Sequence, residues 1–520
     1  MRIRLIILLN VFFLCFLCEA QDIIPLPNHY EQREGELKLK RKISISVPET
    51  FASVMPGFTQ MADKFSVKIK KQKKGLIRVI ENKTLLNPEE YKLTIDSKTI
   101  TIEAGHANGC FYGLQSALQL INKAGPKGSI QCALIHDWPR YEWRGLMLDE
   151  SRHFMGMNEV KNLLDFMALQ KLNKFHWHLT DSQGWRIEIE QYPLLTSVGG
   201  IGDLTNPDRP AQYYTQAEIT EIVEYARQRC IEIIPEIDMP GHAAAAVKSY
   251  PEFSGGGTRR YPHFTFNPGK DGTYTFLTNI LKEVAALFPS QYIHIGGDEV
   301  HFGNEQWNDK PEIWQLMDTH GLDGLTGVEH YFLNRMSDSI KNMNKTLIGW
   351  DEVVNANLPA SNTMVMWWRH EKPGQLEKAI NKGYQIIMCP RIPLYLDFVQ
   401  HASHQYGRKW SDGAFAPIEL VYNFPGTNYT SGVSISTPLI KGMQGNVWTE
   451  VIHTPERLQF MVYPRLSALS EAAWTEDSVK NFENFNSRMD HMMTIYKKMG
   501  IAFFDYKNPD SNPEVAGPNK

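Results

Sequence analysis

Two kinds of segment alternate regularly through most of this chain, and no other feature constrains the fold as strongly. Between Trp138 and Trp474, short apolar stretches typical of buried strands are separated by longer amphipathic stretches typical of helices. Strands are predicted at residues 144–148, 174–179, 231–237, 292–295, 346–348, 364–367, 385–388 and 441–447. Helices are predicted at residues 157–170, 216–229, 273–287, 325–343 and 455–473. Eight strands in this alternation predict an α/β fold, a (β/α)8 or TIM barrel.

A doubly wound open sheet is the other architecture that the alternation allows. Such sheets often carry a glycine-rich phosphate-binding turn after the first strand. No such fingerprint follows residues 144–148, where the sequence reads Asp149-Glu150-Ser151-Arg152-His153. The barrel is therefore the favoured architecture.

The segment that precedes the barrel has a different sequence pattern. Short runs with period-two alternation are predicted as strands at residues 42–47, 76–80, 91–95 and 99–103, with helices at 51–65 and 109–122. Residues 21–137 are therefore predicted to form a small α+β domain, and no residue set in it suggests chemistry. The barrel is expected at 138–500, followed by a tail at 501–520 that we expect to be loose from Asn508 onward.

The first twenty residues are typical of an export signal. Arg2 and Arg4 precede an apolar run at 5–17 that is interrupted only by Asn10, and cleavage is expected before Gln21. The apolar run is too short for a comfortable membrane span. We therefore expect a periplasmic or secreted protein with residues 1–20 removed.

The cysteines argue against a lipid anchor and against a zinc or redox motif. Acylation would use Cys18, but bulky Phe16 and Leu17 precede it, so a lipoprotein is the less favoured alternative. The four cysteines that follow the predicted signal are widely spaced and form no C-x-x-C pair. They are Cys110, Cys132, Cys230 and Cys389. Whether Cys110 and Cys132 form a disulfide is left open.

Composition and charge are those of an ordinary globular protein. Hydrophobic residues make up 42% and charged residues 22% of the chain, and the formal net charge is −4. The densest basic run, at residues 68–74, is predicted to be a solvated loop or an edge strand. A nucleic-acid partner is therefore not expected.

Polar and aromatic residues cluster where the predicted barrel strands end. Because those ends meet at one face of a TIM barrel, we expect the residues to line one pocket. Sugar rings pack their C–H faces on aromatic rings and offer hydroxyls to charged groups. Trp350, Trp368 and Trp448 suit the first need, although each could instead belong to the core; Arg152, Asp181 and Glu450 suit the second. The pattern predicts a glycan pocket.

Glu299 is the best candidate for a general acid. Glycoside cleavage needs a carboxylic acid that keeps its proton near neutral pH, which burial and a neighbouring anion such as Asp298 both favour. Helix capping is the alternative role for this acidic pair. The preceding Gly296-Gly297 favours catalysis, because small residues allow a ligand to approach closely.

A second carboxylate is harder to assign. A retaining glycosidase normally places its nucleophile about 5–5.5 Å from the acid. Because successive strand side chains point to opposite faces, Asp298 is not expected to be that group. Either another strand or the substrate itself must supply the nucleophile.

Histidines near the strand ends could instead bind zinc. The candidates are His153, His176, His178, His242 and His294. The tryptophan-rich surroundings make a role in binding hydroxyls the favoured alternative, so no metal and no organic cofactor are expected.

Several motifs, in order, resemble those of glycoside hydrolase family 20, the β-N-acetylhexosaminidases. His294-Ile295-Gly296-Gly297-Asp298-Glu299 looks like the H-x-G-G-D-E signature of that family. The other matching segments are Arg152 within Ser-Arg-His-Phe, His176-Trp177-His178-Leu179-Thr180-Asp181, Pro240-Gly241-His242, Gly349-Trp350-Asp351-Glu352, Tyr395-Leu396-Asp397 and Trp448-Thr449-Glu450. The resemblance covers residues from about 138 to 474, and residues 21–137 resemble the small domain that commonly precedes this barrel.

The resemblance implies substrate-assisted catalysis, in which the acetamide oxygen of the substrate is the nucleophile. Glu299 would act as acid and then as base, Asp298 would hold the acetamide N–H, and Tyr395 would donate its hydroxyl to the acetamide oxygen. The remaining implied contacts are Trp350, Trp368 and Trp448 as pocket walls, Arg152, Asp397 and Glu450 on ring hydroxyls, and Asp181 and His242 as support for the acid. Of the adjacent Trp367 and Trp368, only one can face the pocket, and Trp368 fits the family pattern better.

The expected partner is a glycan with a terminal β-linked N-acetylhexosamine, and the enzyme is expected to release that sugar from the non-reducing end of the glycan. A catalytically inactive glycan-binding protein and a disaccharide-releasing enzyme are the alternatives. The sequence leaves open the natural glycan, the preference between epimers, the role of residues 398–440 and the assembly, for which a homodimer is one option.

Overall fold

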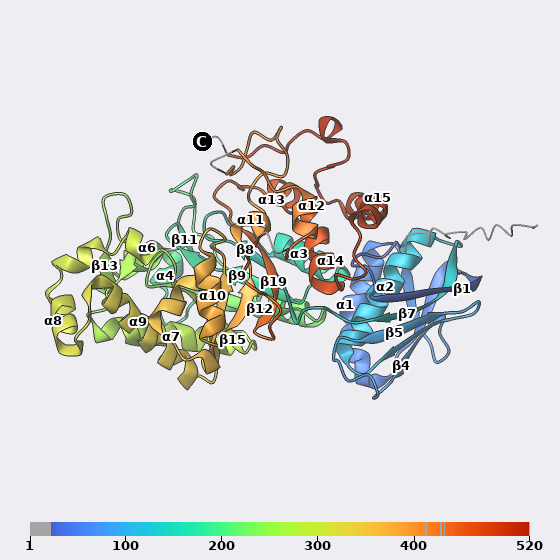
Figure 1. Ribbon diagram of the computed structural model, residues 1–520, viewed down its shortest axis with the longest axis horizontal. Coiled ribbons are helices and arrows are strands. Elements are labelled where there is room, and N and C mark those ends of the chain that lie inside the picture. The colour runs from blue at the N-terminus through green and yellow to red at the C-terminus, as the bar shows by residue number, and fades with distance from the viewer. Residues whose placement is uncertain (1–21, 411–412, 427–428, 431, 519–520) are drawn as a thin grey trace, which may run out of the picture.

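The computed structural model describes residues 22–410, 413–426, 429–430 and 432–518, so the predicted export signal lies outside the described residues. Figure 1 shows a smaller N-terminal unit beside a larger body that contains the barrel. In the described part of the chain, no helix is both long and apolar enough to cross a membrane.

The N-terminal domain is a seven-stranded mixed sheet with the strand order β1-β7-β5-β6-β4-β2-β3. Its strands are β1 His29–Lys38, β2 Lys42–Ser46, β3 Lys68–Lys71, β4 Ile77–Glu81, β5 Tyr91–Ile95, β6 Ile100–Ala104 and β7 Ser129–Asp137. The helices α1 Met55–Lys64 and α2 Ala107–Ala124 accompany the sheet. The basic run forms the edge strand β3, where lysine side chains discourage pairing with another chain.

The predicted α/β class and TIM barrel are confirmed. Eight parallel strands close in the order β12-β15-β16-β17-β18-β19-β8-β9. Their bounds are β8 Trp143–Asp149, β9 Lys174–His178, β12 Glu232–Met239, β15 Tyr292–Gly296, β16 Thr346–Trp350, β17 Thr363–Trp367, β18 Gln385–Met388 and β19 Ile440–Val447. The helices that follow the strands include α3 Met157–Leu169, α5 Gln216–Arg227, α7 Asp271–Leu287, α9 Gly324–Asn342 and α10 Pro373–Asn381.

Two expectations about the C-terminal part were wrong. The helix expected at 455–473 is two helices, α13 Pro455–Val462 and α14 Arg465–Trp474, because Pro464 lacks an N–H and its ring clashes with the preceding turn. The tail is not loose throughout: the Glu514 carboxylate lies 2.8 Å from Nη1 of Arg457 and accepts the backbone N–H of Gln405. The last helix, α15 Phe482–Met499, precedes this tail.

Buried ion pairs join the domain to the barrel. Lys171, after α3, lies 2.8 Å from Asp137 at the end of β7, and neither side chain is exposed. Arg144 of β8 lies 2.7 Å from Glu89 of the N-terminal domain. Because an unpaired buried charge is costly, these contacts fix the domain against the amino-terminal end of the barrel, away from the strand ends that form the site.

Candidate active site

A cavity opens at the carboxyl ends of the barrel strands and gathers nine of the eleven residues that the sequence singled out. They are Arg152, His242, Asp298, Glu299, Trp350, Trp368, Tyr395, Trp448 and Glu450. Asp181 and Asp397 do not line the cavity but are buried beside it. Arg391 and Arg408 also line it and were not predicted.

Asp298 and Glu299 both reach this cavity, so the expectation that they would face opposite ways was wrong. Strand β15 ends at Gly296, and the backbone then takes positive φ angles at Gly296 (70°), Gly297 (85°) and Glu299 (54°). This turn replaces the alternation of a strand. Gly296 is further required because a Cβ there would lie 1.8 Å from Oδ1 of Asp238. The Gly-Gly pair therefore lets two consecutive carboxylates enter one pocket.

His242 lies between the two carboxylates and a third one. Its Nε2 is 3.6 Å from Asp298 and 3.7 Å from Glu299, and its Nδ1 is 3.1 Å from Asp181. Burial disfavours the charged imidazole, but the carboxylates of Asp181, Asp238 and Asp298 outweigh it and raise the pKa of His242 to about 10. The ring is therefore a cation that holds both acids in place.

Asp181 anchors the groups around it rather than facing the cavity. Its carboxylate lies 2.7 Å from Nη2 of Arg152 and accepts a 3.1 Å hydrogen bond from Nε2 of His178. Burial favours its neutral form, but the charges of Arg152 and His242 hold the pKa of Asp181 well below its usual range. This ionised carboxylate thereby orients Arg152 and His242 at once.

The Asp298 carboxyl has a raised pKa. Burial raises the pKa of this carboxyl to about 6; the charge of His242 opposes the rise, and the carboxylate of Glu299 adds to it. Its Oδ1 is buried without a hydrogen-bond partner among the described residues. Such an acceptor suits a ligand N–H.

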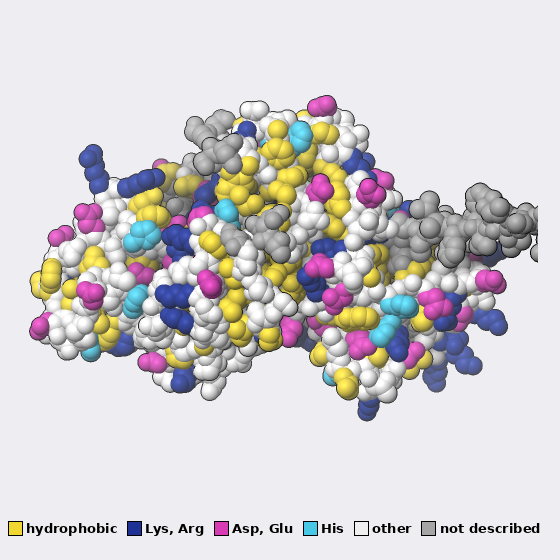
Figure 2. All heavy atoms as spheres, viewed as in Figure 1, with side chains coloured by type: hydrophobic (Ala, Val, Ile, Leu, Met, Phe, Trp, Pro, Cys, Tyr) yellow, Lys and Arg dark blue, Asp and Glu magenta, His cyan; other side chains and the backbone are white. Residues whose placement is uncertain are grey.

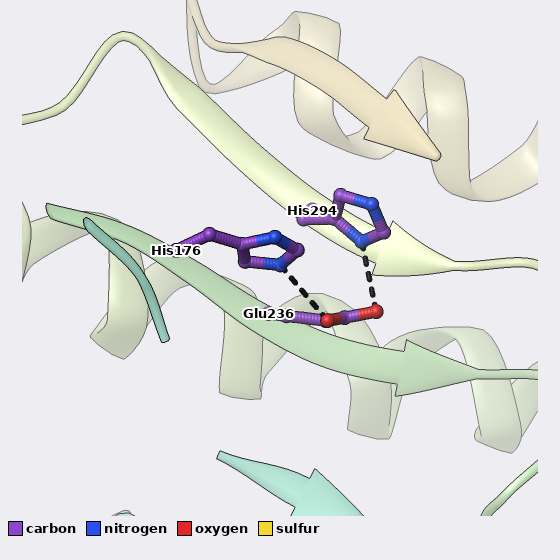
Figure 3. Close-up of side chains that lie close together, drawn as sticks. All are labelled: His176, Glu236 and His294. Atoms are coloured by element: carbon purple, nitrogen blue, oxygen red, sulfur yellow. Dashed lines mark ion pairs between the residues drawn. The ribbon is translucent and has the colours of Figure 1, made fainter. Parts of the chain in front are cut away.

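Glu236, in the interior of the barrel, is the centre of the network beneath the cavity. Its carboxylate accepts hydrogen bonds from Nδ1 of His178 (2.6 Å) and from Nε1 of Trp350 (3.0 Å). His176 and His294 each place a ring nitrogen 2.9 Å from it, as Figure 3 shows. These neighbouring histidines offset burial and hold the pKa of Glu236 well below its usual range.

The cluster of His176, Glu236 and His294 also has the composition of a metal site, with its ligand atoms within 4.8 Å of one another. Gln444 donates to Nδ1 of His176 at 3.0 Å, because its Oε1 accepts from the indole of Trp143. The proton of His176 is then on Nε2, facing Glu236, and burial lowers the pKa of this ring to about 4. Both ring nitrogens of His176 therefore face protein groups, Gln444 on one side and Glu236 on the other.

The histidines proposed as alternative zinc ligands therefore separate into different environments. His176, His178 and His294 surround Glu236, and His242 joins the carboxylates of the cavity. Nδ1 of His153 lies 2.6 Å from the carbonyl of Thr449.

Aromatic rings form the walls of the cavity. Trp350 and Trp448 lie 5.8 Å apart, and Trp368 is parallel within 12° to Tyr395 at 6.3 Å. Trp368 donates its indole N–H to Glu352, while Trp367 packs into the main core. Burial raises the pKa of Tyr395 well above its usual range, so its hydroxyl keeps a proton to donate.

Two arginines complete the rim. Arg408 pairs with Glu450 and places Nε 3.6 Å from Asp397, whose carboxylate oxygens have no hydrogen-bond partner among the described residues. Burial raises the pKa of Asp397 to about 7. The guanidinium of Arg391 lies 5.0 Å over the ring of Trp368. Both arginines lie in or near the long segment after β18, which has no regular pattern, so they were not predicted. The only signal in the sequence was a basic residue at the expected mouth of the barrel.

Comparison with known proteins gives one consistent family. Residues 141–477 match the family model described as "Glycosyl hydrolase family 20, catalytic domain", and residues 20–138 match "Glycosyl hydrolase family 20, domain 2". A β-hexosaminidase of Porphyromonas gingivalis is 33% identical over 93% of this chain, which spans 64% of that relative. A β-hexosaminidase of Vibrio furnissii is 32% identical over 86% of this chain and 76% of its own length.

Solved structures agree with the sequence comparisons. The exo β-N-acetylglucosaminidase of Vibrio harveyi, solved with N-acetylglucosamine, superposes with a TM-score of 0.85 at 32% identity, covering 93% of this chain and 78% of the other. The β-N-acetylhexosaminidase of Bacteroides fragilis gives a TM-score of 0.81 at 31% identity, covering 92% and 96%.

Replacing Glu236 by Gln should destabilise the protein by about 3–5 kcal/mol, because it leaves the buried charge of His178 with one anion fewer. Urea denaturation measures the loss. Glu232→Gln is the matched control on the same strand: Glu232 pairs with Lys174 in a partly exposed position, so we expect a loss of about 1 kcal/mol or less. Equal losses for the two variants would contradict the role of Glu236.

Proposed function

Because the chain belongs to glycosyl hydrolase family 20 and is a glycoside hydrolase, we propose that it is an exo-acting β-N-acetylhexosaminidase. It would release terminal N-acetylglucosamine or N-acetylgalactosamine with retention. One observation carries the proposal: Asp298 and Glu299 enter the same aromatic-walled cavity, and Nε2 of a cationic His242 lies 3.6 Å from the first and 3.7 Å from the second. The names of the relatives are consistent with this activity.

In the first step, Glu299 would donate its proton to the glycosidic oxygen as that bond breaks. The carbonyl oxygen of the substrate's acetamide would attack the anomeric carbon and form an oxazolinium intermediate. Asp298 would accept a hydrogen bond from the acetamide N–H and stabilise the positive charge that develops there. The buried, unpartnered Oδ1 of Asp298 and the retained proton of Tyr395 support these roles.

In the second step, Glu299 would take a proton from water as the water opens the intermediate. Two substitutions at one carbon give net retention. Trp350, Trp368 and Trp448 would wall the acetamide and the sugar face. Arg152, Asp397 and Glu450 would hold ring hydroxyls, and the unpartnered oxygens of Asp397 and Glu450 support that assignment. Asp181 would act through His242 and Arg152.

We also propose that the protein is exported, on the basis of the first twenty residues alone. An inactive glycan-binding protein is the competing function, but Asp298, Glu299 and Tyr395 are all present and face the cavity.

Glu299→Gln should lower kcat on N,N′-diacetylchitobiose by about 10²–10⁴-fold, because the leaving sugar then lacks its proton donor. Product release followed by chromatography measures the rate. Glu305→Gln, an exposed glutamate six positions along the chain, is the matched control and should leave kcat unchanged. A Glu299→Gln enzyme with wild-type turnover would eliminate Glu299 as the acid.

The value of kcat/KM should fall as the pH drops below about 6, and protonation of Asp298 should cause this acid limb of the profile. The ionised form holds the acetamide, and the raised pKa of about 6 means that this form is lost as the pH falls below that value. In a profile of kcat/KM against pH, Asp298→Asn should lower the rate and remove the limb. His242→Gln removes the cation that opposes the rise, so its limb should move to higher pH. A limb that persists unchanged in Asp298→Asn would assign it to another group.

A further inference from the structure

A projecting loop packs against His242 and against the short segment that follows the general acid. It joins β13 Ser254–Gly256 to β14 Thr265–Phe266, and it stands out from the barrel in Figure 1. The loop is attached to the catalytic groups: Phe264 packs 4.7 Å from the ring of His242, and its carbonyl accepts the N–H of Ala243. Its position is therefore coupled to the site.

An aromatic surface joins this loop to the acid. The short helix η3 Val300–Phe302 begins immediately after Glu299, and the N–H of Phe302 donates to the carbonyl of Glu299. Phe302 is 42% exposed, and its ring is stacked on that of Tyr261 within 25°. Tyr261 is partly buried, so the exposed ring of Phe302 is the one that suits the apolar face of a sugar ring.

The same surface is basic. Residues 254–266 contain Arg259 and Arg260 but no Asp or Glu, and both arginines are exposed. Among the described residues, neither arginine forms an ion pair, whereas Arg260 lies 5.2 Å over the ring of Tyr261. Lys and Arg side chains project at this corner of the molecule in Figure 2. The nearest acidic side chain along the chain after η3 is the exposed Glu305.

The general acid identifies which part of a substrate this surface meets. Glu299 delivers its proton to the oxygen of the leaving group, and its side chain is one-third exposed, whereas Asp298 is nearly buried. The residues that follow Glu299 toward solvent therefore border the leaving group rather than the terminal sugar. This step rests on the proposed function.

We propose that Tyr261, Phe302, Arg259 and Arg260 form a subsite for the leaving part of the glycan and that this subsite favours a leaving sugar with a negative charge, such as a hexuronic acid. The stacked rings bind the sugar face, and the two guanidiniums attract its carboxylate. Because the arginines are exposed, the preference should weaken as salt rises.

Two disaccharides test the proposal: N-acetylglucosamine β-1,4-linked to glucuronic acid and the same sugar linked to glucose. The wild type should have about a three- to tenfold higher kcat/KM on the acidic disaccharide at 20 mM NaCl, mostly through KM, and this ratio should fall toward one at 500 mM NaCl. Arg259→Ala with Arg260→Ala should abolish the ratio. Lys70→Ala with Lys71→Ala removes the same charge from the distant edge strand β3 and should preserve it.

Phe302→Ala should raise KM on both disaccharides. It should leave unchanged the inhibition constant of N-acetylglucosamine thiazoline, which has no leaving group. A wild-type ratio of one, or a ratio that survives loss of both arginines, would overturn the subsite while leaving the proposed function intact. Absence of hydrolysis of both disaccharides, together with absence of thiazoline binding, would overturn the proposed function and the subsite with it.

Discussion

The site depends on one buried carboxylate, that of Glu236, which accepts hydrogen bonds from His178 and Trp350 inside the barrel. Removing a carboxylate from water is costly, and the cost is offset only when opposite charges and donors surround it. Here the charges alternate outward: Glu236 fixes the cation His178, and His178 fixes the anion Asp181. Asp181 in turn holds His242 and Arg152. The charged groups that line one side of the cavity are therefore all positioned, directly or through these contacts, by Glu236.

The second constraint is the backbone after β15. Side chains of a regular strand alternate between faces, which would separate Asp298 from Glu299. Positive φ angles at Gly296, Gly297 and Glu299 break the alternation, and the close contact between Gly296 and Asp238 leaves no room for a Cβ. A left-handed conformation at the non-glycine Glu299 is strained, and such strain is typical of functional sites. The turn thus brings two carboxylates with different environments into one pocket.

Much of this architecture could be predicted from the sequence. All eight barrel strands follow from the alternation of apolar and amphipathic segments, because that periodicity reflects burial directly. Strands β1 and β7 were missed: β1 is mostly exposed and charged and carries little apolar pattern. The single helix expected at 455–473 runs across Pro464, because the apolar periodicity continues on both sides of this helix-breaking residue. Of the nine predicted residues that line the cavity, the strand-end rule located eight, and the family resemblance supplied Tyr395.

The parts that could not be predicted depend on contacts between distant strands. Glu236 meets His176 and His294 only because β12 pairs with β9 and β15 in a particular register. Arg391 and Arg408 reach the cavity from a segment with no regular pattern. The shared face of Asp298 and Glu299 required the backbone angles at Gly296 and Gly297. In each case the sequence contains the residues but not the pairing that gives them a role.

The central claim, that the acetamide of the substrate is the nucleophile, is tested most directly by comparing 4-nitrophenyl β-D-glycosides with and without the 2-acetamido group. We predict release of 4-nitrophenol from the N-acetylglucosaminide, blocked by the thiazoline that mimics the intermediate, and no release above background from the plain glucoside. Comparable rates on the two glycosides would show that the protein supplies the nucleophile itself and would contradict the mechanism.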